Sequence, residues 1–191
     1  AAVHLHRVRA DVLPDRGLAV PVRANGAVGD VRHGLVVHLV APTGEEHGEV
    51  TSNAGYLLTA FIRERGLGKT FAAETGFVLE RDPDTVRAPD FAFVPADRIP
   101  AGARSTKFSR LVPALVVEVL SPGDAAVEVE EKIEQWLAFG VDEVWVVNPK
   151  RRTLTVHARG RDAHTFRSEE VVRGSGVLAG LSMEVGALFP G

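Results

Sequence analysis

Two acids and one lysine in this sequence have types and positions that could support metal-assisted chemistry. Asp90 follows Pro89 at the start of an apolar run, Glu118 lies inside a second apolar run, and Lys132 lies in the helical segment that follows. Two carboxylates joined by a main-chain carbonyl, here that of Val119, form an oxygen site suited to Mg²⁺ or Mn²⁺. An ammonium beside them can hold an attacking water or stabilise charge developing on a phosphate. The candidate catalytic residues are therefore Asp90, Glu118 and Lys132, and the candidate metal ligands are Asp90, Glu118 and Val119.

Glu118 stands in "LVVEVL", a run that predicts a strand buried on both faces. Its neighbours on the same face are Val116 and Leu120. The opposite face carries Val117 and Val119, so neither face is polar. A carboxylate there loses its hydration, which raises its pKa or costs free energy unless a cation or a hydrogen-bond donor compensates. We expect a metal as that partner, and an ion pair with an arginine or lysine is the structural alternative.

A helix is predicted from about residue 125 to Gly140, and it positions Lys132 at the border of its buried face. From there the ammonium can reach back toward the strand end while the stem lies on apolar surface. Glu128 lies one turn earlier on the same border, and Gln135 is expected to face outward. The buried stripe of this helix consists of Val129, Ile133, Trp136 and Leu137.

The remaining elements are predicted as a mixture of strands and helices around this strand-helix unit. Residues 34–42 read as a strand, and Thr43 with Glu46 forms a capping box for a helix that Gly66 closes. Residues 69–80 and 87–95 read as the two arms of a hairpin. Two strands joined at 148–152 follow the second helix, and the remainder suggests two short strands and a terminal turn. The pattern predicts an α/β or α+β sheet with helices packed against it.

Composition limits the classes of protein that remain. The chain has 191 residues, 45% of them hydrophobic, which suits a single domain. With 22 basic and 25 acidic residues the formal charge is −3, so any phosphate binding must be local. The absence of cysteine excludes disulfides, zinc-thiolate sites and a thiol nucleophile, and it permits a reducing compartment. Cytoplasm is the default expectation, because neither a signal peptide nor a membrane-spanning run is recognisable.

Four motifs carry a resemblance to a known family. They are "APD" at 88–90, "VVEVLSP" at 116–122, the later Lys132, and "GVDEVWVVNP" at 140–149. In this order and spacing they resemble the Uma-type restriction endonucleases of the PD-(D/E)XK nuclease superfamily. The resemblance extends to the helical segment after residue 34 and to "AETGFVL", so it covers about 29–188 and leaves 1–28 as the least readable part. It implies a restriction-endonuclease-like core, a central mixed sheet flanked by helices.

The resemblance also implies roles for individual residues. Asp90 matches the motif aspartate and Glu118 the following acidic ligand. Lys132 matches the family's lysine, which lies in the next helix instead of at its usual place two residues after the acidic ligand. Leu120 occupies that usual place. Trp136 stands where the family has Tyr, and Asn148 where it often has Asp. The additional site candidates from the resemblance are Asp30, which replaces a family Glu with a shorter side chain, His47, where the family often has His, and Glu128, where it often has Asp. The alternative for His47 is a core histidine satisfied by hydrogen bonds. Glu74 is a further candidate that could line the same sheet face, and a cross-strand ion pair is its alternative.

Basic residues in two predicted loops are candidate phosphate contacts. The alternative is that these loops are charged for solubility. The candidates are Arg104, Lys107 and Arg110 in the first loop, and Lys150, Arg151 and Arg152 in the second.

Three functions fit these observations. The first is a Mg²⁺- or Mn²⁺-dependent endonuclease acting on nucleic acid, with DNA as the expected substrate and, by analogy with domains of this size, a homodimer as the expected assembly. The second is a nuclease-fold module that binds or assembles without useful catalysis. The third is a glycosidase that uses Asp90 and Glu118 as paired acids, which would leave Lys132 without a role.

Overall fold

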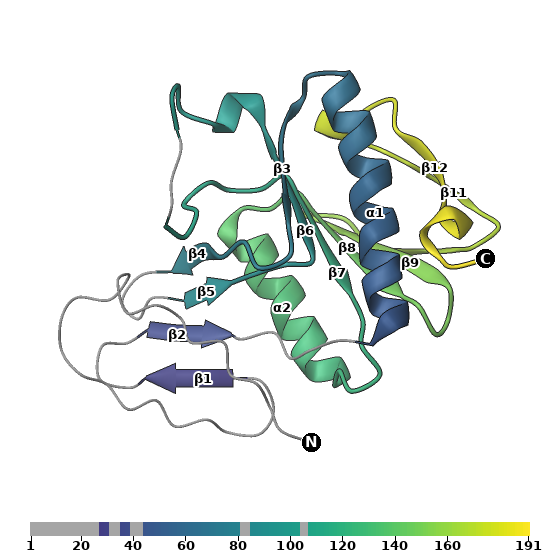
Figure 1. Ribbon diagram of the computed structural model, residues 1–191, viewed down its shortest axis with the longest axis horizontal. Coiled ribbons are helices and arrows are strands. Elements are labelled where there is room, and N and C mark those ends of the chain that lie inside the picture. Colours follow the sequence, from purple (N-terminus) through teal and green to yellow (C-terminus); the bar gives the residue numbers. More distant parts are fainter. Residues whose placement is uncertain (1–26, 31–34, 39–43, 81–84, 104–106) are drawn as a thin grey trace.

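A mixed sheet of six strands forms the centre of the computed structural model, which describes residues 27–30, 35–38, 44–80, 85–103 and 107–191 (Figure 1). The central pair of strands is parallel and all other pairs are antiparallel. In sheet order the strands are β10 (His164–Arg167), β9 (Thr153–Ala158), β8 (Glu143–Asn148), β7 (Leu115–Val119), β6 (Phe91–Pro95) and β3 (Gly68–Ala72). This arrangement confirms the predicted α/β fold with a mixed central sheet.

Two helices cover opposite faces of this sheet, α1 (Glu45–Glu64) on one side and α2 (Ala126–Phe139) on the other (Figure 1). The sheet has one hydrophobic core on its α1 face and another on its α2 face. Side chains along β7 contribute to both, because successive side chains of a strand point to opposite faces. Leu115 and Val117 pack with the α1 cluster, whereas Val116 packs with the α2 cluster. No helix in the described ranges is long and apolar enough to cross a membrane.

The ends of the helices agree only in part with the sequence-based expectation. The N-cap of α1 is Gly44, which has no side chain to cap the helix, so the predicted Thr43 capping box is wrong. Thr43 itself lies outside the described residues. At the other end Gly66 follows the helix with a φ of 62°, in the left-handed region that favours glycine, as predicted. Gly140 ends α2 in the same way, with a φ of 114°.

The predicted hairpin forms, but both of its arms break and pass into a second sheet. The parts of the arms away from the connecting turn, β3 and β6, pair in the central sheet. The parts next to the turn pair in a four-stranded sheet of order β1-β2-β5-β4. The strands of that sheet are β1 (Ala27–Asp30), β2 (Leu35–His38), β5 (Thr85–Arg87) and β4 (Phe77–Glu80). The break in the second arm, at 88–90, places Asp90 directly before β6.

The C-terminal segment packs on the α1 face of the central sheet. The predicted pair of short strands is β11 (Val171–Arg173) with β12 (Ser182–Glu184). A third short strand, β10, was not predicted and extends the central sheet beside β9. Three 3₁₀ helices complete the described elements, η2 (Ala96–Arg98), η3 (Gly176–Leu178) and η4 (Val185–Leu188). Leu178, Met183 and Leu188 join the core beneath α1.

Candidate metal and catalytic site

Asp90 and Glu118 lie side by side at one edge of the central sheet. The antiparallel register of β6 and β7 pairs Phe91 with Val117, so the next position in each strand brings Asp90 beside Glu118. The nearby charge of Asp90 also raises the pKa of the Glu118 carboxyl. The sheet itself therefore brings the two predicted carboxylates together.

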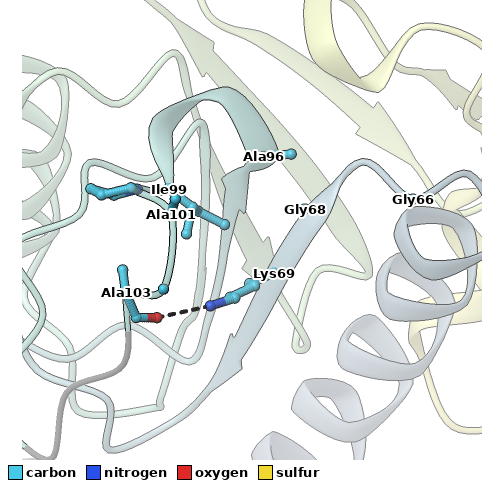
Figure 2. A pocket seen from close by; sticks show the side chains of 9 residues that line it. Gly66, Gly68, Lys69, Ala96, Ile99, Ala101 and Ala103 are labelled. Carbon is cyan, nitrogen blue, oxygen red and sulfur yellow. Dashed lines mark hydrogen bonds between the residues drawn. The ribbon is translucent and has the colours of Figure 1, made fainter.

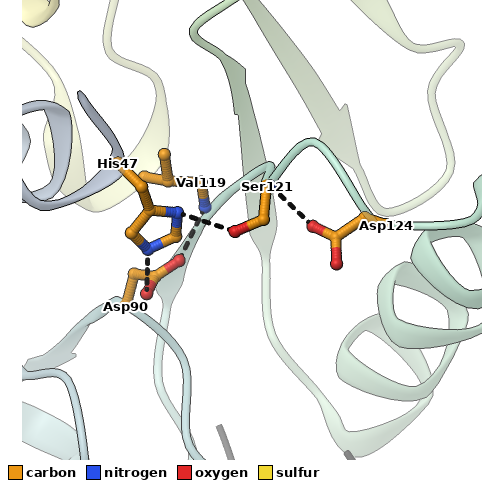
Figure 3. A network of polar contacts seen from close by, with 5 residues as sticks. All are labelled: His47, Asp90, Val119, Ser121 and Asp124. Atoms are coloured by element: carbon orange, nitrogen blue, oxygen red, sulfur yellow. Dashed lines mark hydrogen bonds and ion pairs between the residues drawn. The ribbon is translucent and has the colours of Figure 1, made fainter. Parts of the chain in front are cut away.

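Backbone and side-chain donors fix both oxygens of Asp90 (Figure 3). The Val119 N–H donates to Asp90 Oδ2 over 2.7 Å, and His47 Nε2 lies 3.2 Å from Asp90 Oδ1. His47 comes from the first turn of α1, and its Nδ1 lies 3.3 Å from the hydroxyl oxygen of Ser121. The hydrogen bond to Asp90 raises the pKa of His47 against the opposing effect of burial. The predicted site residue His47 is thus in direct contact with Asp90.

Glu118 points to the α2 face, where the indole of Trp136 holds it. Trp136 Nε1 donates to Glu118 Oε1 over 2.8 Å. Burial first and the neighbouring charge of Asp90 second raise the pKa of Glu118, to about 7, against the lowering effects of Lys132, Trp136 and Arg87. The expected cost of placing a carboxylate in this strand is therefore real and is only partly offset by the protein.

Lys132 lines a small pocket together with Glu118, as the helix pattern predicted. The pocket holds about 10 Å³ between the end of β7 and the first half of α2. Its lining residues are Glu118, Val119, Leu120, Asp124, Val129, Lys132, Ile133 and Val146. The ammonium acts on the carboxyl of Glu118 and lowers its pKa. Three of the predicted residues, Glu118, Val119 and Lys132, therefore meet at one pocket.

Arg87 is a residue near the site that sequence reasoning missed. It is buried at the end of β5, and its Nε donates a hydrogen bond to the side-chain oxygen of Gln135 on α2. Gln135 is therefore part-buried and bonded, which corrects the expectation that it faces outward. Arg87 also lowers the pKa of Glu118 through its charge. An arginine beside a turn reads as a surface residue, so no sequence signal indicated its burial.

The donor set at this edge fits a small, hard cation. Asp90 and Glu118 supply two carboxylates, and a divalent cation would offset both the burial of Glu118 and the neighbouring charge of Asp90, the two causes that raise the pKa of Glu118. In the described part of the chain, no group of three or more His, Cys, Asp or Glu side chains is placed to hold a metal ion. Two carboxylates still suit Mg²⁺, because this ion usually keeps several waters as its remaining ligands.

The other predicted site residues are not gathered at this pocket. Glu74 is exposed in the turn after β3, with a φ of 73°, and Glu128 is exposed on α2. Asp30 ends β1, but its side chain lies outside the described residues. We therefore find no contact that joins Glu74 or Glu128 to the two acids.

The two basic loops differ in their relation to the site. The turn of Lys150, Arg151 and Arg152 follows β8, which runs parallel to β7 with Val147 opposite Val119, so this turn lies at the edge that carries Glu118. Arg104 lies outside the described residues. Lys107 and Arg110 are exposed in a segment that instead bridges to β4, through Ser109 and Phe77.

A larger cavity, of about 420 Å³, lies at the opposite edge of the sheet (Figure 2). It lies where Gly68 of β3 pairs with Pro95, the end of β6 far from Asp90. Lys69 is the charged residue among those that line it, and its Nζ donates to the carbonyl of Ala103 over 3.2 Å. The lining residues are Gly66, Gly68, Lys69, Ala96, Ile99, Pro100, Ala101, Gly102 and Ala103. Without an acid, this cavity is no part of the candidate site.

Comparisons with known proteins agree with this architecture. No curated protein matches the chain. The crystal structure of a "putative nuclease belonging to DUF820" from Anabaena variabilis is similar in fold, with a TM-score of 0.69 and 18% sequence identity over 81% of this chain and 85% of that chain. The model of the Uma2 family, described as "Putative restriction endonuclease", matches residues 32–186. The chain therefore belongs to the Uma2 family of restriction-endonuclease-like proteins.

Proposed function

We propose that this protein is a metal-dependent endonuclease that hydrolyses phosphodiester bonds of nucleic acid, with DNA as the expected substrate. The observation that carries the proposal is the convergence of Asp90, Glu118 and Lys132 at one edge of the sheet. Membership of a nuclease family supports the same chemistry. A glycosidase using the two acids alone would leave the lysine and the buried charge unexplained.

In this proposal Asp90 and Glu118, with the carbonyl of Val119, hold Mg²⁺ or Mn²⁺. When bound, such an ion lowers the pKa of water and stabilises charge on phosphate oxygens. The protein's own contribution is to keep the two carboxylates in place. The Val119 N–H and His47 hold Asp90, and Trp136 holds Glu118.

Lys132 acts beside the acids in the proposed reaction. Water attacks phosphorus, the bond to the leaving oxygen breaks, and negative charge grows on the phosphate oxygens. An ammonium at the pocket stabilises that charge and orients the attacking water. Because Lys132 reaches the pocket from α2, its position depends on the packing of this helix against β7.

Nucleic acid would approach this edge from the turn between β8 and β9. Lys150 and Arg151 are exposed in that turn. Arg152 is less available, because it donates to the carbonyl of Pro190 and lies over the ring of Phe189. The exposed acids on α2 repel a phosphate backbone, and these are Glu128, Glu130, Glu131 and Glu134.

The same acids favour a second candidate function, a nuclease-fold module that binds metal but cleaves poorly. They lie near Lys132 in the sequence of α2 and are exposed, so their charge opposes the binding of a phosphate backbone beside the pocket. The two candidates share the metal site and differ in cleavage.

Two measurements test the proposal in sequence. Calorimetric titration of Mn²⁺ into wild type, Asp90→Asn and Glu118→Gln should show binding in wild type that both substitutions abolish without unfolding the chain. Cleavage of supercoiled plasmid and of single-stranded substrates with Mn²⁺ then separates the nuclease from the inactive module. If wild type binds no metal, or if both variants bind as wild type does, the proposed site is wrong.

A further inference from the structure

We propose that Trp136 is a positioning residue that makes Glu118 a one-oxygen ligand. Its indole N–H occupies Glu118 Oε1, which leaves Oε2 as the oxygen that faces a cation. The inference rests on the proposed function, since it concerns the same metal site. It adds that the packing of α2 sets the orientation of the Glu118 carboxylate on β7.

The indole of Trp136 is held firmly enough to act in this way. The side chain is fully buried in the α2 cluster. The ring of Phe77 meets it edge-on at 6.1 Å between centroids, and the ring of Phe139 does so at 6.5 Å. Aromatic contacts of this kind fix a ring in position and orientation. The Nε1 atom therefore has little freedom to follow a moving carboxylate.

Glu118 is fixed from the other side by the sheet. Its strand lies between β6 and β8, and Glu118 pairs with Val146 in the parallel ladder. With the backbone held by β7 and Oε1 held over 2.8 Å by Trp136, the carboxylate has one orientation. A donor on one oxygen favours coordination of a cation through the other oxygen, and loss of such a supporting bond typically weakens metal affinity 10- to 100-fold.

The second tryptophan of the chain provides a matched control. Trp145 is equally buried, and its Nε1 donates to Glu143 Oε2 over 2.9 Å. Glu143 pairs with Leu115, at the end of β7 away from Glu118. Trp145→Phe therefore removes the same kind of ring and the same kind of hydrogen bond, but on the α1 face of the sheet, where Trp145 pairs with Val117 and its bond goes to the far end of the strands.

The test is a comparison of Mn²⁺ affinity by calorimetry in wild type, Trp136→Phe and Trp145→Phe. We expect Trp136→Phe to bind about 10- to 100-fold more weakly. Trp145→Phe should bind within about 3-fold of wild type, because its indole donates to Glu143 and not to a carboxylate of the proposed metal site. Equal affinity of the two folded variants would overturn the inference while leaving the metal site standing. Absence of binding in wild type would overturn both the site and the inference.

A second measurement covers the case in which Trp136→Phe does not fold. The indole N–H resonances of both tryptophans can be followed by ¹⁵N–¹H NMR in the metal-free chain, with Glu118→Gln as the change. A donor to a carboxylate resonates differently from a donor to a neutral amide, so the Trp136 signal should move and the Trp145 signal should stay. Titrating Mg²⁺ into wild type should then shift the Trp136 signal more than that of Trp145. An unmoved Trp136 signal in Glu118→Gln would show that the hydrogen bond does not hold the carboxylate.

Discussion

His47 and Asp90 are 43 positions apart in the sequence, yet His47 Nε2 lies 3.2 Å from Asp90 Oδ1. The contact joins the first turn of α1 to the start of β6 at the edge of the sheet that also carries Glu118. Since Asp90 Oδ2 accepts the Val119 N–H, the carboxylate is held at both oxygens. Asp90 is thus oriented before any cation arrives, which lowers the entropic cost of binding one.

His47→Gln should remove a stabilising interaction whose size depends on pH. The pKa of His47 is raised in the folded state, so its contribution to stability is full below pH 6.5 and is lost as the pH rises through the folded pKa. We expect the free energy of unfolding to fall by about 1.5 kcal/mol at pH 6 and by less at pH 9. Urea unfolding at the two pH values measures both.

His157 provides a control of opposite sign for this prediction. Burial lowers the pKa of His157 on β9, so its folded state prefers the neutral ring and stability is lost as the pH falls below 6.5. His157→Gln should therefore relieve a cost at low pH. If both variants change stability in the same direction between pH 9 and pH 6, the assigned environments are wrong.

Glu118→Gln should stabilise the metal-free protein above neutral pH. The pKa of Glu118 is raised from 4.5 to about 7, so the folded state binds more protons than the unfolded state between these values. Wild-type stability therefore falls as the pH rises through this window, by on the order of 3 kcal/mol in total. We expect the variant to unfold at higher urea concentration than wild type at pH 8 and at a similar one at pH 4.5.

Two controls test whether the stability change of Glu118→Gln comes from the buried charge. Glu128→Gln removes one charge from the exposed side of α2 and should leave stability nearly unchanged. Saturating Mn²⁺ should reverse the order at pH 8, because it stabilises wild type and not Glu118→Gln. A variant less stable than wild type in the absence of metal would contradict the account of Glu118 as an uncompensated carboxylate.

Arg87→Lys should destabilise the fold although it keeps the positive charge. The buried guanidinium donates through Nε to Gln135, and a lysine cannot reproduce that planar donor. The expected loss is about 1–3 kcal/mol in the free energy of unfolding. Arg161→Lys, in the exposed turn before β10, should change it by less than about 0.5 kcal/mol. Equal effects of the two substitutions would show that the Arg87–Gln135 bond contributes nothing.

Replacing Lys150 and Arg151 together by alanine should weaken DNA binding in a salt-dependent way. Each phosphate contact that is lost reduces the slope of log affinity against log salt by about 1. Fluorescence anisotropy with a labelled duplex at several salt concentrations, in the presence of Ca²⁺ to limit cleavage, measures the slope. Arg161→Ala is the control, because its turn lies at the other edge of the sheet. An unchanged slope in the double variant would exclude this turn as a phosphate contact.

Local patterns explain which parts of this structure could be predicted. Glu118 in an all-apolar strand and Lys132 on the border of an apolar stripe are consequences of strand and helix periodicity, which a sequence displays directly. The break at 88–90 was not visible, because each arm of the hairpin reads as one continuous strand and only pairing with a second sheet divides it.

Contacts between distant segments could not be predicted. Trp136 looked like any buried residue of a helix stripe, and its bond to Glu118 depends on how α2 docks on β7. His47 was a site candidate through the family resemblance alone, and its contact with Asp90 depends on how α1 is placed against β6. The burial of Arg87 depends on the second sheet. These three contacts depend on tertiary packing, which helix and strand propensities and hydrophobic patterns do not indicate.

The edge that carries Asp90 and Glu118 also has a consequence for folding kinetics. It contains the start of α1, the start of β6, the end of β7 and the pocket beside α2. The contact of His47 with Asp90 and the pairing of β6 with β7 join segments that are far apart in the sequence. Such contacts form late, because the chain must close large loops before they become favourable. A nascent or partly folded chain can hold its strands and helices and still lack the two-carboxylate site. If the proposed metal site is right, metal binding would then report the completion of folding.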